Sequence, residues 1–152
     1  MSIEVNNLRI TKLRDYLLDI IRELNEEYQQ LNINFLSNDV DSYSLDKIPV
    51  VPQINSWIIG IELNRDVYNF RSRMNYSSDV ISNIENIGFY ETFERIIKQK
   101  NGNKDLPDIQ GIQSIRCLNA GTMNRADTNT AEFNIQIQIE YIDDGTNISP
   151  SL

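Results

Sequence analysis

The sequence contains no histidine, a single cysteine and no long apolar run, and each absence excludes a class of function. Without an imidazole there is no histidine general base, no histidine-activated nucleophile and no histidine metal ligand. Cys117 alone cannot form an intramolecular disulfide or a thiolate zinc cluster. No apolar run approaches the roughly 18 residues of a membrane-spanning helix, and residues 1–10 do not resemble a signal peptide. We therefore expect an intracellular protein that does not contact membranes and is not an enzyme.

Length and charge narrow the choice further. The 152 residues are 40% apolar and 24% charged, which is typical of one folded domain. We expect that domain over residues 1–142 and a flexible tail over residues 143–152. The 22 carboxylates outnumber the 14 lysines and arginines, so the net charge is −8 and nucleic-acid binding is disfavoured. Solubility is the simplest role for this charge, and the alternative is a surface past which DNA slides without binding.

The N-terminal third predicts one amphipathic helix followed by an extended segment. Apolar residues recur every three or four positions over residues 13–31, and we expect Thr11 to be the N-cap. Residues 43–51 have an extended pattern. Pro49 and Pro52 indicate that this segment is an edge strand or an irregular one, because proline cannot donate to a sheet ladder.

The middle of the chain predicts a long strand. Residues 56–74 alternate between apolar and polar, which favours one continuous strand, or a strand with a bulge near residues 64–66. In this register Tyr68 and Phe70 share one face of the strand and two arginines share the other.

A helix is predicted over residues 78–100, with Ser78 or Asp79 as its cap. Gly88 interrupts the pattern, and we interpret it as a residue that ends a first helix at positive φ. This interpretation gives two apolar stripes, one before the glycine in the sequence and one after it. They comprise Val80, Ile81, Ile84 and Ile87, and then Phe89, Phe93, Ile96 and Ile97.

The last third has the clearest pattern. Apolar and polar residues alternate strictly over residues 130–142, which predicts a half-buried antiparallel strand paired with residues 113–122. The polar link between them, residues 119–130, is either a long loop or a hairpin that projects beyond the sheet. The whole sequence thus predicts an α+β domain. We expect a mainly antiparallel sheet with helices packed on one face, an N-terminal helix and a closing C-terminal β-hairpin.

Catalytic, cofactor-binding and metal-binding residues are not predicted anywhere in the sequence. No glycine-rich phosphate loop is present. The pairs Asp39/Asp41 and Asp143/Asp144 lack the remaining ligands of a calcium loop, so solvated turns are the better interpretation. Cys117 lies beside apolar positions and is best explained as a small buried residue, since no base accompanies it.

Interface residues are the only candidate site. Trp57 is either a core residue, which we favour, or an anchor for a partner. Arg71 and Arg73 either pair with acids across a subunit interface or lie in water at an edge. Residues 118–130 are too long and polar to be ordered by their own packing, so a neighbouring subunit is expected to stabilise them. Within this segment the candidate contact residues are Asn119, Thr122, Met123, Asn124, Arg125 and Asp127.

Several segments resemble a family of phage tail terminator proteins, also described as minor capsid or head–tail joining proteins of Gram-positive phages and prophages. The resemblance begins at residues 83–91, NIENIGFYE, continues with Phe93, and extends over residues 8–141. Further matching positions are Gly102-Asn103, Leu106-Pro107-Asp108, residues 112–121 with their Ala120-Gly121 end, Asp127, Thr130-Ala131 and residues 133–141. The order of elements is also similar to that of the family.

The resemblance implies a structural role in a virion or tail-like particle assembled in the bacterial cytoplasm. Such proteins form a ring, typically of six subunits, that caps the tail tube and ends its polymerisation. The ring also provides the surface to which head-completion or connector proteins bind. The implied partners are therefore copies of the chain itself, the tail tube protein, and a sheath or connector protein. DNA would only pass through the lumen.

Other functions remain open at this point. In a headless, contractile, bacteriocin-like particle the ring would be a terminal collar with no capsid to meet. A monomeric adaptor that binds a partner through the Trp57 strand edge is a second class. A metal-dependent hydrolase built from carboxylates alone is a third class, and it would need acids from separate elements in one cleft.

Overall fold

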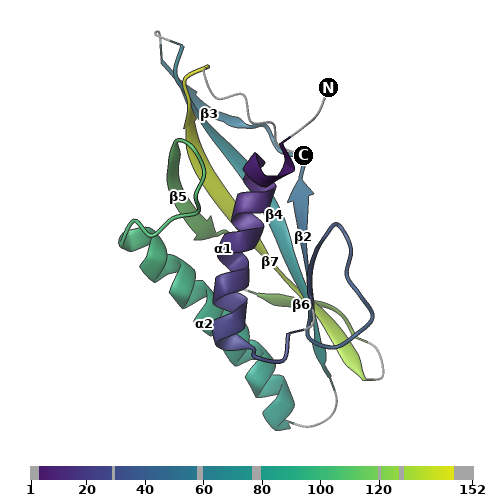
Figure 1. The fold of residues 1–152 in the computed structure, drawn as a ribbon. Helices are drawn as coiled ribbons and strands as arrows, with labels where there is room; N and C mark the ends of the chain where they lie inside the picture. The colour runs from purple at the N-terminus through teal and green to yellow at the C-terminus, as the bar shows by residue number, and fades with distance from the viewer. Residues whose placement is uncertain are drawn as a thin grey trace.

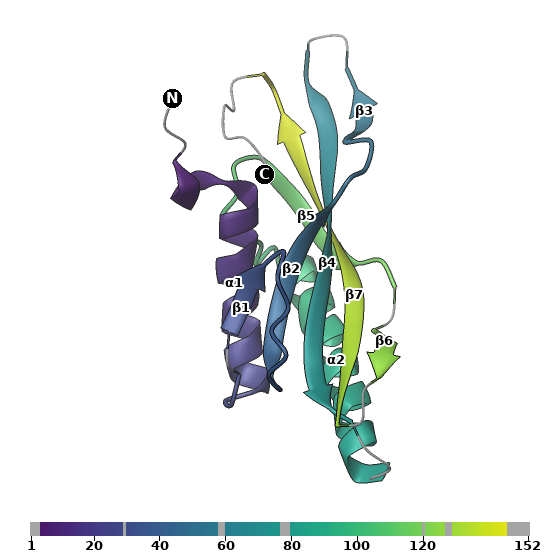
Figure 2. The same ribbon diagram turned by 90° about the vertical axis from the view of Figure 1, so that its right-hand side faces the viewer.

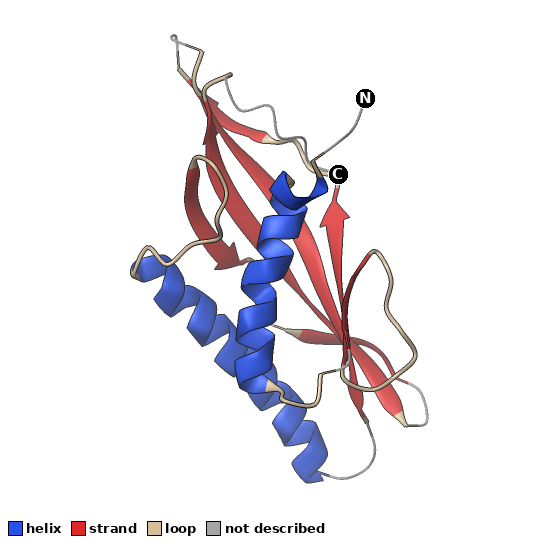
Figure 3. Cartoon of the chain, viewed as in Figure 1, coloured by secondary structure: helices blue, strands red, loops and turns tan. Residues whose placement is uncertain are grey.

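The computed structural model of the chain describes residues 4–28, 30–57, 60–76, 80–119, 121–126 and 129–145. Within them, two helices, α1 (Arg9–Leu24) and α2 (Val80–Gly102), cover one face of a seven-stranded, mostly antiparallel sheet (Figures 1 and 3). Figure 2 shows the same arrangement from the side, with the opposite face of the sheet bare of helices. This is the α+β fold expected from the sequence, with its N-terminal helix and closing C-terminal hairpin.

Two long strands form the centre of the sheet. β4 (Glu62–Asn75) and β7 (Thr130–Asp143) pair antiparallel from one end to the other without a shift in register. Successive side chains of a strand point to opposite faces, so the core residues of β4 and β7 come from every second position. Val67, Glu132 and Gln138 on the other register are buried as well. The spacing of the core residues explains why the sequence predicted β7 and most of β4.

Shorter strands flank this central pair. β2 (Ser42–Ile48) pairs antiparallel with β4, and β1 (Gln30–Ile33) pairs parallel with β2. β3 (Gln53–Ser56) pairs with the first residues of β4. The order β1-β2-β4-β7-β5 therefore places the long strands at the middle of the sheet.

The far edge of the sheet is built from two consecutive strands. β5 (Ile112–Cys117) pairs with the C-terminal half of β7, and β6 (Thr122–Ala126) pairs with its N-terminal half. The link expected to project beyond the sheet thus folds back along it. Of the two alternatives given for this link, neither a long loop nor a projecting hairpin fits residues 122–126, because β6 pairs with the chain's own β7.

A single core lies between the helices and the sheet. Aromatic rings join its layers: Tyr43 stacks on Phe70 with centroids 5.6 Å apart, and Phe70 stacks on Phe93 at 4.9 Å. Tyr68 and Phe70 both point into this core, as the alternation of β4 predicted. The core therefore holds α2 to β4 through Phe93.

The boundaries of the first helix differ from the prediction. α1 follows a short 3-10 turn, η1 (Val5–Asn7), and its N-cap is Leu8. Thr11 lies inside the helix, where its hydroxyl donates to the carbonyl oxygen of Val5 at 2.7 Å. The helix ends at Leu24, and Leu31 is a buried residue of β1. In the sequence, the apolar spacing of three to four residues continues past the end of the helix. The reason is that Leu31, a buried residue of the next strand, happens to lie at the next position of that series.

Two further predictions in the middle of the chain are wrong. β2 is not an edge strand, since it pairs with β1 on one side and β4 on the other; Pro49 and Pro52 follow it instead. Residues 56–74 are not one strand, because Gly60 at φ +80° turns the chain between β3 and β4. β4 itself pairs with β7 without a bulge.

Helix α2 is continuous through Gly88, contrary to the prediction of a break there. Its second stripe is in the core as expected, with Phe93 and Ile97 buried and Phe89 and Ile96 packed against them. The expected capping residues, Ser78 and Asp79, lie outside the described residues, as does the tail from residue 146 onward.

Candidate interaction surface

The first half of α2 carries an exposed apolar surface, which we call the α2 apolar face. It consists of Val80, Ile81, Ile84 and Ile87, which are 67%, 67%, 60% and 56% exposed. From the sequence, these residues were predicted to form the first apolar stripe of the helix. At about 100° of rotation per helical residue, Ile84 and Phe93 lie on opposite sides of an unbroken helix. Because Phe93 is fully buried, Ile84 must face outward.

The helix is exposed here because it runs past the end of the sheet (Figure 1). Asn86 is the first residue of α2 whose described side chain is buried, and its Nδ2 donates to the carbonyl oxygen of Asn75 at 2.6 Å. Asn75 is the last residue of β4. Among the described residues, no strand therefore lies beneath the turns of α2 before Asn86 to cover their apolar side chains.

Charge is distributed unevenly along α2. Its first fifteen residues contain three glutamates, Glu85, Glu91 and Glu94, and no lysine or arginine. Glu94 accepts a hydrogen bond from the backbone N–H of Gly121 at 3.1 Å, whereas Glu85 and Glu91 are exposed. The α2 apolar face is thus bordered by negative charge, which disfavours contact with phosphates or anionic membranes.

A second set of exposed apolar side chains, which we call the β3 apolar patch, lies in and beside β3. It consists of Val51, Ile54 and Trp57, which are 73%, 44% and 45% exposed. The expectation that Trp57 belongs to the core is wrong. It follows β3 directly, its backbone N–H donates to the carbonyl oxygen of Ile61 at 2.9 Å, and its side chain is exposed.

Charged residues of both signs flank the β3 apolar patch. Glu62 pairs with Ser56 across the β3–β4 ladder, and Asp143 pairs with Glu62. Residues 48–57 contain no acidic or basic side chain. The nearest cation along the ladder is Arg65, whose Nε donates to the carbonyl oxygen of Val51 at 3.2 Å. Its backbone N–H also donates to the carbonyl oxygen of Pro52 at 2.8 Å. A positive charge therefore stands at the base of this patch.

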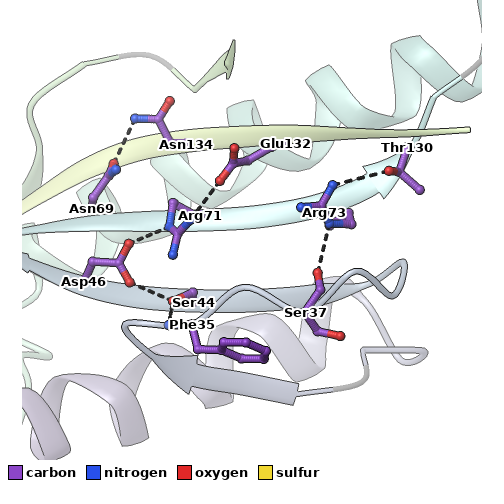
Figure 4. A network of polar contacts seen from close by, with 10 residues as sticks. All are labelled: Phe35, Ser37, Ser44, Asp46, Asn69, Arg71, Arg73, Thr130, Glu132 and Asn134. Carbon is purple, nitrogen blue, oxygen red and sulfur yellow. Dashed lines mark hydrogen bonds and ion pairs between the residues drawn. The ribbon is translucent and has the colours of Figure 1, made fainter. Parts of the chain in front are cut away.

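Arg71 and Arg73 lie on the bare face of the sheet within a polar network (Figure 4). Arg71 forms ion pairs with Asp46 at 2.5 Å and with Glu132 at 2.9 Å. Arg73 donates to the carbonyl oxygen of Ser37 at 2.9 Å. Arg71 pairs with acids of its own chain, and both arginines lie on a central strand, so the expectation that they lie in water at an edge is wrong. A contact of either arginine with a neighbouring subunit stays a prediction.

The other candidate residues fall along the β5–β6 edge. The side chain of Asn119 accepts from the N–H of Gln136 at 2.9 Å, so it supports the chain's own ladder. Thr122 donates to Asn134 at 3.2 Å. Met123 is 49% exposed and Asn124 is also exposed, so both are open to a partner. The side chain of Arg125 and the whole of Asp127 lie outside what the structure describes.

One buried ionic cluster was not anticipated. Asp66 is 3% exposed and pairs with Arg9 at 2.7 Å and with Lys47 at 3.7 Å. The hydroxyl groups of Tyr68 and Tyr141 approach the same carboxylate at 3.0 and 3.5 Å. Burial, and then the nearby Asp66, raise the pKa of Tyr141 to about 12. This cluster holds the start of α1 on the sheet. The signal in the sequence was Asp66, an acidic residue at a position of β4 that faces the core.

The remaining polar candidates are engaged in local structure. Asp39 accepts from Ser37 at 3.1 Å, Asp41 accepts from Asn25 at 2.9 Å, and Asp143 accepts from the N–H of Gly145 at 2.9 Å. In the described part of the chain, no three acidic or cysteine side chains gather in a way that would hold a metal ion. Burial, and then Glu94, raise the pKa of the Cys117 thiol to about 12. Thiolate is therefore scarce at neutral pH.

Neither α1 nor α2, as far as their residues are described, has the length and apolar character that crossing a membrane requires. Compared with known protein families, the chain matches no family model. Compared with curated proteins, its sequence matches none. The function is therefore argued from exposed apolar side chains, above all the four at the start of α2.

Proposed function

We propose that the chain is a structural subunit that assembles with copies of itself into a ring, a hexamer by its resemblance to tail terminators. The ring would cap a phage-type tail tube, end its polymerisation and carry the surface for head completion. The proposal rests on one observation: the motif at residues 83–91 has some of its apolar residues in the core and others on the surface. Phe89 and Tyr90 pack in the core, whereas Ile84 and Ile87 of the same motif are exposed.

An exposed apolar helix face supports an assembly role. Four neighbouring apolar side chains that are more than half exposed lower the solubility of an isolated chain, so such surfaces mark contacts with other proteins. The residues of the motif that point outward do not contribute to this chain's own core. Their apolar character is therefore better explained by a partner than by folding.

The net charge of −8 is compatible with a ring through which DNA passes. A lumen lined with carboxylates would repel the phosphate backbone and prevent it from sticking. The proposed protein partners are the tail tube protein and a sheath, connector or head-completion protein. In a headless particle the same ring would be a terminal collar. A ring whose lumen is lined by lysine and arginine would contradict this part of the proposal.

A monomeric adaptor is the second candidate function. The observation that favours it is Trp57, which is 45% exposed beside a strand with only one partner among the described strands. Tryptophan is common among residues that anchor protein contacts. An adaptor would stay monomeric in solution and bind a partner of different sequence through this edge.

The experiment is negative-stain imaging of the chain mixed with the tube protein as it polymerises. We expect tubes of limited length with an extra density at one end only. Tubes that grow without limit and remain bare at both ends would exclude the terminator or collar role and favour the adaptor. As a matched control, Lys98→Gln changes an exposed residue of α2 outside the α2 apolar face and should cap tubes normally.

A further inference from the structure

We propose that two side chains of α2, Glu94 and Asn101, close one edge of the sheet to pairing with a strand of another chain. This edge, which we call the β5–β6 edge, is the side of β5 and β6 that faces away from β7. Among the described residues, both strands pair with β7 alone. An edge of this kind presents backbone groups with which another chain can pair. The closure goes beyond the proposed function, because it operates whatever the chain assembles into.

The backbone N–H of Ile115 points out of the sheet at this edge. The N–H of Leu118, just after β5, donates to the carbonyl oxygen of Gln136 in β7 at 2.9 Å. Because successive N–H groups of a strand point to alternate sides in the plane of the sheet, Cys117 and Ile115 direct theirs away from β7. A strand added at β5 would need these two donors in its ladder.

Asn101 occupies the outward donor of Ile115. Its Oδ1 atom accepts a hydrogen bond from the N–H of Ile115 at 2.9 Å. Asn101 is half-buried near the C-terminal end of α2, and this part of the helix packs beside β5 (Figure 1). The side-chain oxygen therefore takes the place that a carbonyl oxygen of an added strand would fill.

Glu94 acts in the same way at the link between β5 and β6. Its Oε1 atom accepts from the N–H of Gly121 at 3.1 Å, and Gly121 directly precedes β6. Gly121 also lies against Tyr90, since an added Cβ atom would be 2.5 Å from the Cγ atom of that ring. Tyr90, Glu94 and Asn101 recur at spacings of four and seven, which places them on one side of the helix. That side of α2 therefore follows the edge from β5 to the start of β6.

The packing of α2 does not cover this edge by itself. A groove of about 600 Å³ lies between α2 and β5, and the residues that line it include Glu94, Asn101, Ile115 and Cys117. The groove leaves room beside the edge. We infer that the hydrogen bonds from α2, and not its bulk alone, keep the outward donors from another strand.

Asn101→Ala tests this closure, because it removes the acceptor while raising the helix propensity of α2. The readout is hydrogen exchange of the Ile115 amide, since an amide exchanges more slowly while it is hydrogen-bonded in a stable structure. At low protein concentration we expect this amide to exchange about fivefold to tenfold faster than in wild type. At high concentration we expect it to be protected again, because a strand of a second copy supplies the missing acceptor.

Sedimentation velocity over the same concentrations measures the association itself. Asn101→Ala should form larger species than wild type, and Glu94→Ala should do the same through the donor of Gly121. Asn101→Asp keeps an oxygen acceptor and should behave as wild type. Gln99→Ala changes an exposed residue of the same helical turn and is the matched control. Thermal melts show whether each variant is folded, and if Asn101→Ala is not, Glu94→Ala provides the test.

Two outcomes would overturn the inference. One is an Ile115 amide that exchanges at the same rate in wild type and in Asn101→Ala at every concentration. The other is a pair of folded chains, Asn101→Ala and Glu94→Ala, that both keep the association state of wild type. Capping of tubes is read separately, with the wild-type chain. Tubes capped by wild type, together with either of these outcomes, would leave the proposed function intact and contradict the closure alone.

Discussion

The Nε atom of Arg9 lies 2.7 Å from the Oδ2 atom of Asp66, and this ion pair joins the first turn of α1 to β4 across 57 positions of the chain. The side chains are 12% and 3% exposed. The arginine also stacks on Tyr141, with its Cζ atom 4.3 Å from the ring centroid. A buried carboxylate with several donors is costly to disturb, because removing it leaves the cations without their counter-charge.

Asp66→Asn is therefore expected to lower the free energy of unfolding by about 3–5 kcal/mol. Urea denaturation monitored by circular dichroism would measure the loss. Asp15→Asn, an exposed change on the same helix that Arg9 begins, is the control and should stay within about 0.5 kcal/mol of wild type. A loss below 1 kcal/mol for Asp66→Asn would mean that the cluster contributes little to stability.

Replacing each of two glycines with alanine is expected to change the stability of the fold in opposite directions. Gly88 lies inside α2 with open space around it, so Gly88→Ala should stabilise the monomer by about 0.5–1 kcal/mol through helix propensity. Gly121 packs against Tyr90, and an added Cβ would lie 2.5 Å from its Cγ. Gly121→Ala should destabilise the fold by about 1–3 kcal/mol. Thermal melts of both variants test these two predictions. Melting temperatures that shift in the same direction would contradict them.

The hydroxyl groups of Ser72 and Tyr90 form a short hydrogen bond that links β4 to α2 in the core. Both side chains are buried. Tyr90→Phe should cost about 1–3 kcal/mol, because it leaves the serine hydroxyl buried without this partner. Adding Ser72→Ala to Tyr90→Phe should recover part of that loss. A double-mutant cycle by urea denaturation measures the coupling, and strictly additive effects would argue against the bond.

Because the Cys117 thiol is buried, the folded chain is expected to lose stability at alkaline pH. Its thiol has a pKa of about 12 in the folded chain, whereas an unfolded thiol ionises near 8.5. Between these values the unfolded chain loses a proton that the folded chain keeps, so stability falls as pH rises. The stability of wild type relative to Cys117→Ala should decline by up to about 1.4 kcal/mol per pH unit in this window. Parallel pH profiles for the two chains would contradict the raised pKa.

Much of the fold followed from short-range patterns. β7 and most of β4 were predicted because alternation of period two is set within the strand itself. The sequence patterns did not correctly predict the start and end of α1 or the turn at Gly60. A buried residue such as Leu31 looks the same in a sequence whether a helix or a strand places it in the core.

The candidate surface was missed for a related reason. Val80 and Ile81 are apolar, and an apolar stripe on a helix usually faces the core. Treating Gly88 as a break allowed both stripes of α2 to face inward; in one continuous helix they must face opposite ways. Arg71 was misread because its partners, Asp46 and Glu132, come from strands on either side, which only the sheet order brings together.

The unbroken β4–β7 ladder has a mechanical consequence. Tension applied along these strands in opposite directions loads all fourteen residue pairs, from Glu62–Asp143 to Asn75–Thr130, in shear and at the same time. Rupture would require many backbone hydrogen bonds to fail together, whereas peeling from one end would break them singly. The two central strands therefore resist tension along the long axis of the sheet better than they resist peeling from one end.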